Sequence, residues 1–353
     1  MKKETYHIIG VMSGTSLDGI DLAEIVFNYT DEKWSFEIQA AETVPYSSYW
    51  KDKLRDGINY SEGKLERLDF KYTEKLSEEI LKFIREHNIQ EIDAICSHGH
   101  TILHQPEKGF TYQIGNLPRI SKILGRTVIC DFRTQDVALG GQGAPLVPIG
   151  DKLLFPEYDY CLNLGGFANC SFEKNGERIA FDICPANIVL NEYSERLGKD
   201  FDEGGKLAAS GNINTPLLNQ LNALSFYAEK PPKSLGLEWV KRAVYPLLDG
   251  FDISSEDVLR TFTEHIAVQL SKQFSANSLV LITGGGVYNS YLIERLKNLT
   301  SIEVVIPTSN IVEYKEALIF GLLGVLKLRD EVNCLASVTG ASADHSSGKI
   351  FSL

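Results

Sequence analysis

Paired cysteine motifs are missing from this 353-residue chain. No two of its six cysteines stand in the CxxC spacing that is typical of redox sites and zinc ribbons. They are scattered, mostly in apolar stretches that read as strands: Cys96, Cys130, Cys161, Cys170, Cys184 and Cys334. Such contexts predict buried, reduced thiols, which are typical of a cytoplasmic protein.

Long apolar runs and excess positive charge are also missing. No apolar segment reaches the length needed to cross a bilayer, and no cleavable signal segment precedes the first predicted strand. The formal net charge is −12, so non-specific attraction to nucleic acid or anionic lipid is unfavourable, and neither partner is expected. With 43% hydrophobic residues, the composition predicts a cytoplasmic globular enzyme of about two domains.

One short segment, VMSGTSLDGID at residues 11–21, concentrates glycines, hydroxyls and carboxylates. It lies between two strand-like runs, 6–11 and 22–28, and is therefore predicted to be the turn of a hairpin. Glycines let backbone amides approach an anion closely, and the hydroxyls add donors. The carboxylates of Asp18 and Asp21 suit a phosphate only with Mg²⁺ between them. A metal–nucleotide loop and an ordinary polar turn both fit the segment.

The order of predicted elements repeats once along the chain. The first half contains strands at 6–11, 22–28, 34–44, 92–97, 111–114 and 127–130, with helices at 64–87 and 117–124. A glycine-rich linker at 139–145 follows. The second half contains strands at 160–164, 168–173, 178–182, 279–283 and 303–306, with helices at 186–197, 254–274, 290–296 and 314–329. A three-strand meander followed by alternating helices and strands predicts two related α/β domains.

Two polar segments follow strands in the first half. His98, His100 and His104 would share one face of a continued strand, which is compatible with zinc, with polar contacts to a sugar or with packed histidines. No fourth zinc ligand is evident. Further along, Arg133 stands between Asp131 and Asp136. Its planar guanidinium could bind a sugar or phosphate, or it could form an internal ion pair at the hinge between domains.

Two segments of the second half also carry chemistry. Asp182 ends a strand and precedes a predicted helix, where Pro185 fits the first turn. Its carboxylate could accept a proton from a sugar hydroxyl or water, or could merely cap that helix. The triple glycine of LITGGGVYN, residues 284–286, lies between a strand and a predicted helix start, where backbone amides could meet an anionic ligand.

Together these segments resemble one family. VMSGTSLDGID, SHGHTILHQP, DFRTQDVALGGQGAPLVP, LNLGGFANCSF, PPKSLG, LITGGGVYN, KEALIFGLL and SVTGAS are similar, in order, to motifs of the bacterial anhydro-N-acetylmuramic acid kinases. The resemblance implies two duplicated actin-like ATPase domains of the ribonuclease H-like α/β class with an interdomain cleft. We expect residues 1–133 with a returning tail, 331–353, to form the first domain and 134–330 the second.

The resemblance also implies a reaction. Kinases of this family use ATP and Mg²⁺ to phosphorylate O6 of 1,6-anhydro-N-acetylmuramic acid while water opens the anhydro bridge, which serves peptidoglycan recycling. Asp182 aligns with their catalytic base, and a homodimer is expected. The segment expected to bind the ATP phosphates is Gly14, Thr15, Ser16, Leu17, Asp18, Gly19, Ile20 and Asp21, with Asp18 and Asp21 toward Mg²⁺. Further nucleotide-side glycines are Gly165, Gly166, Gly284, Gly285 and Gly286. The expected sugar contacts are His98, Asp131, Arg133 and Glu316.

Some residues depart from the family pattern. Ile183, Cys184 and Ala186 replace Thr, Gly and Gly beside the expected base, and His100 replaces Gln. These changes remove a hydroxyl donor and fill space, so they bear on substrate preference. A related sugar kinase without ring opening and a non-catalytic nucleotide-binding regulator are the alternatives. The retained Asp182 and Glu316 argue against the regulator.

Overall fold

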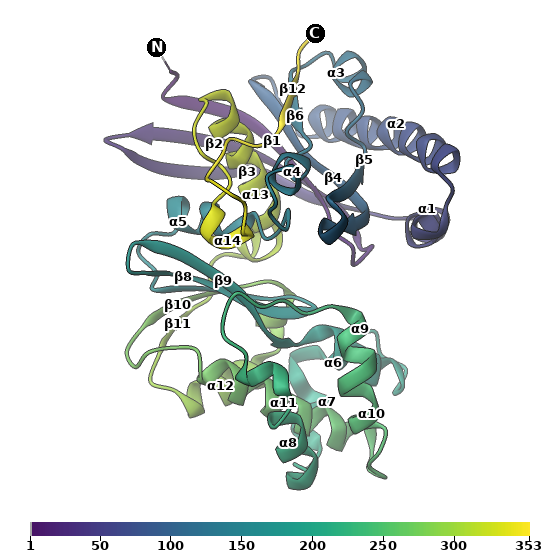
Figure 1. Ribbon diagram of the computed structural model, residues 1–353, viewed down its shortest axis with the longest axis vertical. Coiled ribbons are helices and arrows are strands. Elements are labelled where there is room, and N and C mark those ends of the chain that lie inside the picture. The colour runs from purple at the N-terminus through teal and green to yellow at the C-terminus, as the bar shows by residue number, and fades with distance from the viewer. Residues whose placement is uncertain (1) are drawn as a thin grey trace. The chain divides into compact units, whose positions relative to one another are not determined.

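The computed structural model describes residues 2–353, which fold into two compact units (Figure 1). The first unit comprises the chain up to Leu154 together with Tyr314–Leu353, and the second comprises Phe155–Glu313. Each unit has its own β-sheet and its own hydrophobic core.

The first unit is built on a seven-stranded sheet of order β12-β6-β4-β1-β2-β3, with β5 paired to β4. Its strands are β1 (Thr5–Ser13), β2 (Gly19–Thr30), β3 (Lys33–Pro45), β4 (Ala94–Gln105), β5 (Phe110–Ile114), β6 (Val128–Cys130) and β12 (Lys349–Phe351). Its helices are α1 (Ser48–Asp56), α2 (Glu62–Glu86), α3 (Arg119–Leu124), α4 (Thr134–Ala138), α5 (Val147–Leu154), α14 (Ala336–Thr339) and all but the first turn of α13 (Ser309–Leu328).

The second unit is built on a five-stranded sheet of order β11-β10-β7-β8-β9. Its strands are β7 (Tyr160–Leu164), β8 (Phe167–Lys174), β9 (Glu177–Pro185), β10 (Leu279–Thr283) and β11 (Glu303–Val305). Its helices are α6 (Asn187–Glu195), α7 (Lys206–Ser210), α8 (Thr215–Asn222), α9 (Leu237–Trp239), α10 (Tyr245–Leu248), α11 (Ser255–Ser271) and α12 (Ser290–Leu299). Figure 1 shows α11 and α12 together on one side of this sheet.

The two sheets share one topology. In each, three strands form an antiparallel meander, and the first of them pairs in parallel with a later strand, which in turn pairs in parallel with the next. The order β3-β2-β1-β4-β6 of the first unit thus corresponds to β9-β8-β7-β10-β11 of the second. The predicted fold class, two duplicated α/β domains of the actin-like type, is confirmed by this repeat.

The core of the first unit explains its long helix. The apolar residues of α2 that recur at helical spacing are all buried against the sheet: Leu65, Leu68, Tyr72, Leu76, Ile80 and Phe83. Burying a large apolar side chain stabilises a fold by about 1.5–3 kcal/mol. This stripe therefore fixes α2 on the sheet.

The boundaries between the units differ from those predicted at 133/134 and 330/331. Helix α13 belongs largely to the first unit because its backbone packs closely on that sheet: a Cβ on Gly10 of β1 would lie 2.2 Å from the Ala317 carbonyl oxygen. Helix α5 then packs on α13, where a Cβ on Gly150 would meet Ile319 at 2.5 Å. The C-terminal tail pairs with the sheet of the first unit, through antiparallel pairing of β12 with β6.

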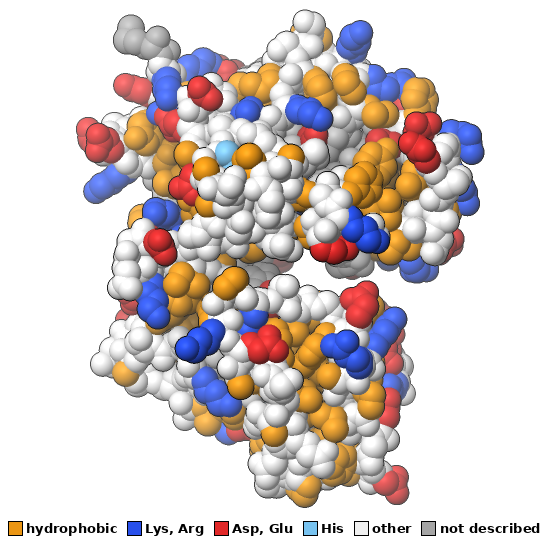
Figure 2. Space-filling model, in the orientation of Figure 1, with side chains coloured by type: hydrophobic (Ala, Val, Ile, Leu, Met, Phe, Trp, Pro, Cys, Tyr) orange, Lys and Arg blue, Asp and Glu red, His pale blue; other side chains and the backbone are white. Residues whose placement is uncertain are grey.

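Several surface and composition features complete the description. All six cysteines are free and buried, as predicted. Within residues 2–353, no helix is both long enough and apolar enough to span a bilayer. Figure 2 shows acidic and basic side chains interspersed over the face in view, with no large area of a single charge sign.

Candidate active site

The glycine-rich segment of the first unit is the turn of a hairpin, as predicted. Strands β1 and β2 pair antiparallel, with Met12 opposite Asp21. The amide of Leu17 donates to the Gly14 carbonyl at 3.3 Å, and Leu17 has a φ of 62°. The left-handed residue of this turn is thus Leu17, and neither of its glycines has a positive φ.

The two glycines of the turn serve different purposes. A Cβ on Gly19 would lie 2.5 Å from the Val44 carbonyl oxygen on β3, so the fold itself requires glycine there. A Cβ on Gly14 would meet only the Ser16 Oγ, at an ordinary 3.5 Å. Because the folded chain has room for a side chain at Gly14, its glycine leaves a backbone that a ligand could approach.

The polar side chains of the turn divide into buried and accessible ones. The Ser13 hydroxyl is buried and hydrogen-bonds the Tyr46 hydroxyl at 2.7 Å and His100 Nδ1 at 2.8 Å, so it is a structural group. Thr15, Ser16 and Asp18 are exposed.

Asp21 is half-buried and accepts a hydrogen bond from the Thr43 hydroxyl at 2.7 Å. Neither Asp18 nor Asp21 belongs to a group of three potential metal-ligating side chains within residues 2–353. Mg²⁺ commonly takes only one or two carboxylates beside phosphate oxygens and water, so this donor set fits the ion when a nucleotide supplies the remainder.

The three histidines of β4 do not converge. His98 accepts a hydrogen bond from Arg133 Nε at 2.8 Å and donates from Nδ1 to the Gly99 carbonyl at 2.9 Å. His100 contacts Ser13, whereas His104 Nδ1 hydrogen-bonds the Thr111 hydroxyl at 3.0 Å. Burial and the Arg133 charge hold the pKa of His98 well below its usual range, so this imidazole is neutral. The zinc hypothesis for these histidines therefore has no geometric support.

Arg133 does not pair with its neighbours in sequence. Its Nη1 donates to the Gly143 carbonyl at 2.6 Å, and Nη2 has no hydrogen-bond partner in the part of the chain that the structure describes. Asp131 instead forms an ion pair with Lys349 at 2.7 Å and accepts a hydrogen bond from Thr134. Arg133 thus forms no ion pair with either flanking aspartate within residues 2–353, and the Nη2 edge of its guanidinium remains available.

Glu316 lies on α13 with an exposed side chain. Its carboxylate makes no hydrogen bond within residues 2–353. Desolvation by the surrounding protein raises the pKa of this carboxyl, and the charge of Arg133 only partly opposes the shift. The adjacent Lys315 is occupied by a buried ion pair with Asp151 at 2.7 Å. Glu316 is therefore the free member of this charged set.

In the second unit, two glycine turns and a helix start lie together. The carbonyl of Gly165 accepts from the Asn187 amide at 3.2 Å, and that of Gly166 accepts from the Ala186 amide at 2.8 Å. These bonds hold the first residues of α6 against the β7–β8 turn. The Asn187 side chain donates to the Leu164 carbonyl at 3.3 Å, beside Gly286.

The fold requires glycine at some positions of the triple glycine and not at others. Gly284 has a φ of 83°, and a Cβ on Gly286 would lie 2.7 Å from the Leu164 side chain. A Cβ on Gly285 would meet nothing within 4 Å. A short 3₁₀ helix, Gly285–Tyr288, follows the strand, and α12 starts at Ser290, where the sequence predicts the start of a helix. Gly285, like Gly14, is free of any packing constraint.

Asp182 is held by a segment outside its own strand. Its Oδ2 accepts from the Leu235 amide at 2.7 Å, and its own amide donates to the Lys233 carbonyl at 3.1 Å. No hydrogen bond reaches Oδ1 from any residue in the range 2–353. Burial raises the pKa of this carboxyl, although the Leu235 amide partly opposes the shift. Helix α6 has no side-chain cap, so the capping interpretation of Asp182 is wrong.

A β-bulge directly follows Asp182. The register of β8 and β9 shifts so that Asn169 pairs with Asp182 and Ala168 with Cys184, which leaves Ile183 as the extra residue. Bulges of this kind re-aim side chains beside active sites. Ile183, Cys184 and Ala186 are all buried in the core of the second unit. The side chains that depart from the family pattern therefore pack mainly in the core next to Asp182.

The segment that holds Asp182 was not identified as functional from the sequence. Residues 231–236 appear in the PPKSLG motif, but their spacing gives no sign of a partner 53 residues away. The Lys233 ammonium donates to the Phe226 carbonyl at 3.1 Å and lies 4.4 Å from the centre of the Phe226 ring.

The profile of the family described as anhydro-N-acetylmuramic acid kinase matches residues 6–353. The kinase of that name from Mannheimia succiniciproducens is 34% identical, over 99% of this chain and 100% of that protein. Its namesake from Xanthomonas oryzae pv. oryzae is 35% identical, over 97% and 96% respectively.

Among solved structures, component A of the Acidaminococcus fermentans (R)-2-hydroxyglutaryl-CoA dehydratase has a TM-score of 0.46 at 14% identity, covering 92% of this chain and 99% of that one. A glucokinase of the ROK family from Streptomyces griseus, in complex with glucose and AMPPNP, has a TM-score of 0.39 at 11% identity, covering 90% and 98%. The sequence relatives span the whole chain, and the chain belongs to the anhydro-N-acetylmuramic acid kinase family.

Proposed function

We propose that this chain uses ATP to phosphorylate O6 of 1,6-anhydro-N-acetylmuramic acid while water opens the anhydro bridge, giving N-acetylmuramic acid 6-phosphate. Family membership makes it a phosphotransferase with an alcohol acceptor. The observation that carries the hydrolytic part is the carboxylate of Asp182, which is fixed through one oxygen and has the other unoccupied. Because the product returns a wall sugar to metabolism, the role we infer is peptidoglycan recycling.

The role of Asp182 follows from the bonding of the anhydro sugar. O6 is an ether oxygen with no proton to lose, so it becomes nucleophilic only as its bond to the anomeric carbon breaks. Asp182 accepts a proton from water, and the water oxygen bonds to the anomeric carbon. The electron pair of the broken bond passes to O6, which takes the γ-phosphoryl group as ADP leaves. A raised pKa makes the ionised carboxylate a stronger base.

Unconstrained glycines support the nucleotide part. A Cβ on Gly14 or on Gly285 would not clash with the chain's own atoms. Since the fold does not explain the glycine at position 14, we infer that a phosphate group approaches the backbone there, and the second unit offers a backbone of the same kind at Gly285. Asp18 and Asp21 would hold Mg²⁺, which when bound neutralises phosphate charge.

The sugar is assigned to charged side chains of the first unit. Arg133 is oriented by His98 and the Gly143 carbonyl, which leaves Nη2 as a donor for a hydroxyl or carboxylate oxygen. Glu316 supplies an exposed acceptor. A donor and an acceptor of this kind suit the lactyl carboxylate and the amide of a muramic acid derivative. Asp131, which is paired with Lys349, is a less available sugar ligand than the sequence indicates.

The test is ADP release by the purified protein with ATP alone, with 1,6-anhydro-N-acetylmuramic acid and with N-acetylmuramic acid. The proposal requires release that depends on the anhydro sugar. Faster release with the open sugar would indicate the alternative kinase without ring opening. ATP binding without sugar-dependent release would indicate the regulator. Either of the last two results contradicts the proposal.

A further inference from the structure

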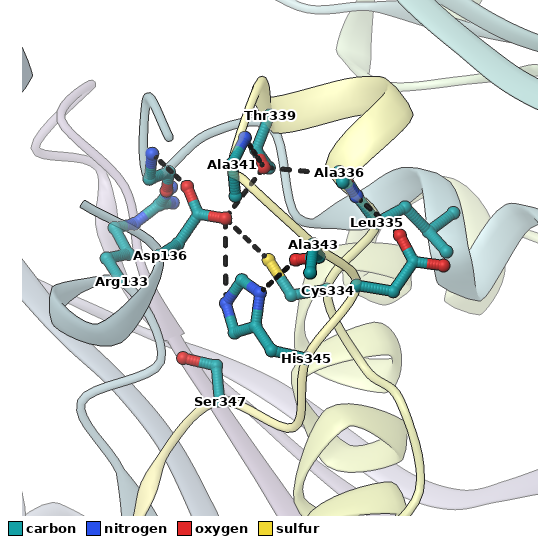
Figure 3. Close-up of polar contacts among 12 residues, drawn as sticks. Arg133, Asp136, Cys334, Leu335, Ala336, Thr339, Ala341, Ala343, His345 and Ser347 are labelled. Carbon is teal, nitrogen blue, oxygen red and sulfur yellow. Dashed lines mark hydrogen bonds and ion pairs between the residues drawn. The ribbon is translucent and has the colours of Figure 1, made fainter. Parts of the chain in front are cut away.

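A buried polar cluster in the first unit lies outside every role assigned above. It consists of Asp136 on α4 with Cys334 and His345 from the tail, and all three side chains are buried (Figure 3). Their potential ligand atoms lie within 4.8 Å of one another. The Cys334 Sγ is 3.1 Å from Asp136 Oδ1, and the His345 Nε2 is 3.6 Å from the same oxygen.

The imidazole of His345 is the anomalous member of the cluster. Its Nδ1 donates to the Ala343 carbonyl at 3.0 Å, which leaves the lone pair on Nε2 in the neutral ring. Nε2 is fully buried, has no hydrogen-bond partner and is aimed at the Asp136 carboxylate, which is also an acceptor. Two acceptors that face each other in a buried site repel unless a cation or a proton lies between them.

The surroundings hold all three side chains in place. Cys334 and His345 face each other across an antiparallel bridge in which each amide donates to the other's carbonyl at 3.1 Å. The Asp136 carboxylate accepts from the Thr339 hydroxyl at 2.6 Å and from the Gly143 amide at 2.6 Å. Carbonyls that orient a histidine and donors that orient a carboxylate are the usual outer partners of metal ligands.

We propose that Asp136, Cys334 and His345 bind a divalent metal ion, with zinc the best match. One thiolate, one imidazole nitrogen and one carboxylate oxygen form a zinc donor set, and the separations of 3.1 and 3.6 Å suit ligands bonded at about 2.0–2.3 Å to one ion. Water completes the coordination. Binding exchanges the thiol proton of Cys334 for the metal. This site is separate from the carboxylates assigned to the Mg²⁺ of ATP.

The metal would tie two distant parts of the first unit together. Cys334 and His345 belong to the returning tail, whereas Asp136 lies 198 residues before Cys334. Through Gly143, which donates to Asp136 and accepts from Arg133, the ion would also stiffen the loop that orients Arg133. The proposed role is therefore structural, and it does not require the metal to touch a substrate.

The experiment measures zinc bound to the full-length protein after equilibration with zinc and removal of loosely held metal by a weak chelator. We expect about one equivalent in the wild type and none in Cys334→Ala or His345→Asn. Cys130→Ala is the matched control, since it removes another buried thiol of the same unit away from the cluster. It should keep its zinc.

Cobalt substitution of the wild type gives a second readout that needs no variant to fold. We expect a thiolate-to-cobalt charge-transfer band that disappears when zinc is added. Zinc should also raise the thermal midpoint of the wild type and of Cys130→Ala, because a ligand that binds only the folded state stabilises it. No stoichiometric zinc, cobalt bound without the thiolate band, or equal zinc in Cys334→Ala would each overturn the proposal. None of these readouts depends on kinase activity.

Discussion

The first turns of the two meanders occupy equivalent places but are built differently. In the first unit, β1 and β2 are separated by Gly14–Asp18, with exposed hydroxyl and carboxylate side chains. In the second, β7 and β8 are separated only by Gly165 and Gly166, whose carbonyls accept the first amides of α6. One turn offers side chains to a ligand, whereas the other supports the helix start that follows Asp182.

The two equivalent turns of this duplicated fold therefore contribute different things, side chains in one and backbone position in the other. The longer turn carries polar side chains on a backbone whose ends are held in place. The β1–β2 hairpin holds both ends, and Gly19 packs against β3. The shorter turn has no side chains to offer and contributes position, by fixing the chain just after the bulge at Ile183. Under the proposed function, we expect the first turn to contact the nucleotide and the second to position the chain that follows Asp182.

The largest effect is expected from Asp182→Asn, which tests the second half of the comparison. The amide keeps the shape and can still accept from the Leu235 amide, but it cannot take a proton. Loss of a general base costs roughly 10²–10⁴-fold in rate, so kcat should fall by that factor with ATP affinity nearly unchanged. Steady-state kinetics and nucleotide titration measure both. Glu177→Gln, on the exposed start of β9, is the control. Retention of most of the activity in Asp182→Asn would exclude the base assignment.

Gly14→Val tests the first half. The folded turn has room for a Cβ, so the protein should keep its thermal midpoint while the branched side chain blocks phosphate. Hydrogen bonds to charged groups contribute about 1.5–3 kcal/mol, so ATP affinity should fall about tenfold to a hundredfold.

Gly19→Ala is the reciprocal variant to Gly14→Val. The added Cβ would clash with the Val44 carbonyl oxygen, so its main effect should be a loss of folding stability and not of ATP affinity. Unchanged ATP affinity in a folded Gly14→Val protein would show that the longer turn is not a nucleotide loop.

A similar pair within the triple glycine sharpens the comparison further. Gly286→Ala would overpack Leu164 and should cost about 1–3 kcal/mol of unfolding free energy. Gly285→Ala meets no atom of the chain, so its stability should match the wild type, and any loss should appear in ATP binding alone. Chemical denaturation and calorimetric titration of both variants distinguish these outcomes. Equal destabilisation by the two substitutions would contradict the division between required and unrequired glycines.

The smallest expected effect concerns pH and stability. Because burial raises the pKa of Asp182 in the folded state, its ionised form destabilises the fold above that pKa, and the penalty disappears as the pH falls below the unfolded-state value. Asp182→Asn should therefore raise the thermal midpoint slightly at neutral pH and lose that advantage in acid. For the wild type, kcat/KM for the sugar should fall on the acid side with an apparent pKa above the usual aspartate range. An identical pH dependence of stability in both proteins would refute the assigned shift.

Much of the fold was predictable because it rests on local patterns. The strands at 160–164 and 279–283 have the predicted bounds, and the apolar stripe of α2 lies in the core. Short helices such as α1 and α5 were missed because so few turns carry little periodicity. The assignment of α13 to the first unit was not predictable, since an apolar helix with small residues can pack on either sheet, and Gly10 shows its use only in three dimensions.

The site was predictable in its parts and not in its connections. Glycine clusters and Asp182 stand at strand ends, where α/β proteins place ligands. The partners that orient them are far apart in sequence: Arg133 is 35 residues from His98, and Leu235 is 53 residues from Asp182. No spacing rule indicates such pairs, because the sheet register and the bulge decide them.

The most direct test of the central claim follows the oxygen of water. The reaction is run in ¹⁸O-water with ATP and 1,6-anhydro-N-acetylmuramic acid, and the sugar phosphate is analysed by mass spectrometry and ³¹P NMR. We predict label at the anomeric hydroxyl and none in the phosphate, because O6 of the sugar itself receives the phosphoryl group. The anomeric hydroxyl exchanges slowly with solvent, so a parallel sample of unlabelled product incubated in ¹⁸O-water sets the background. Label in the phosphate, or none at the anomeric carbon above that background, would contradict hydrolytic ring opening.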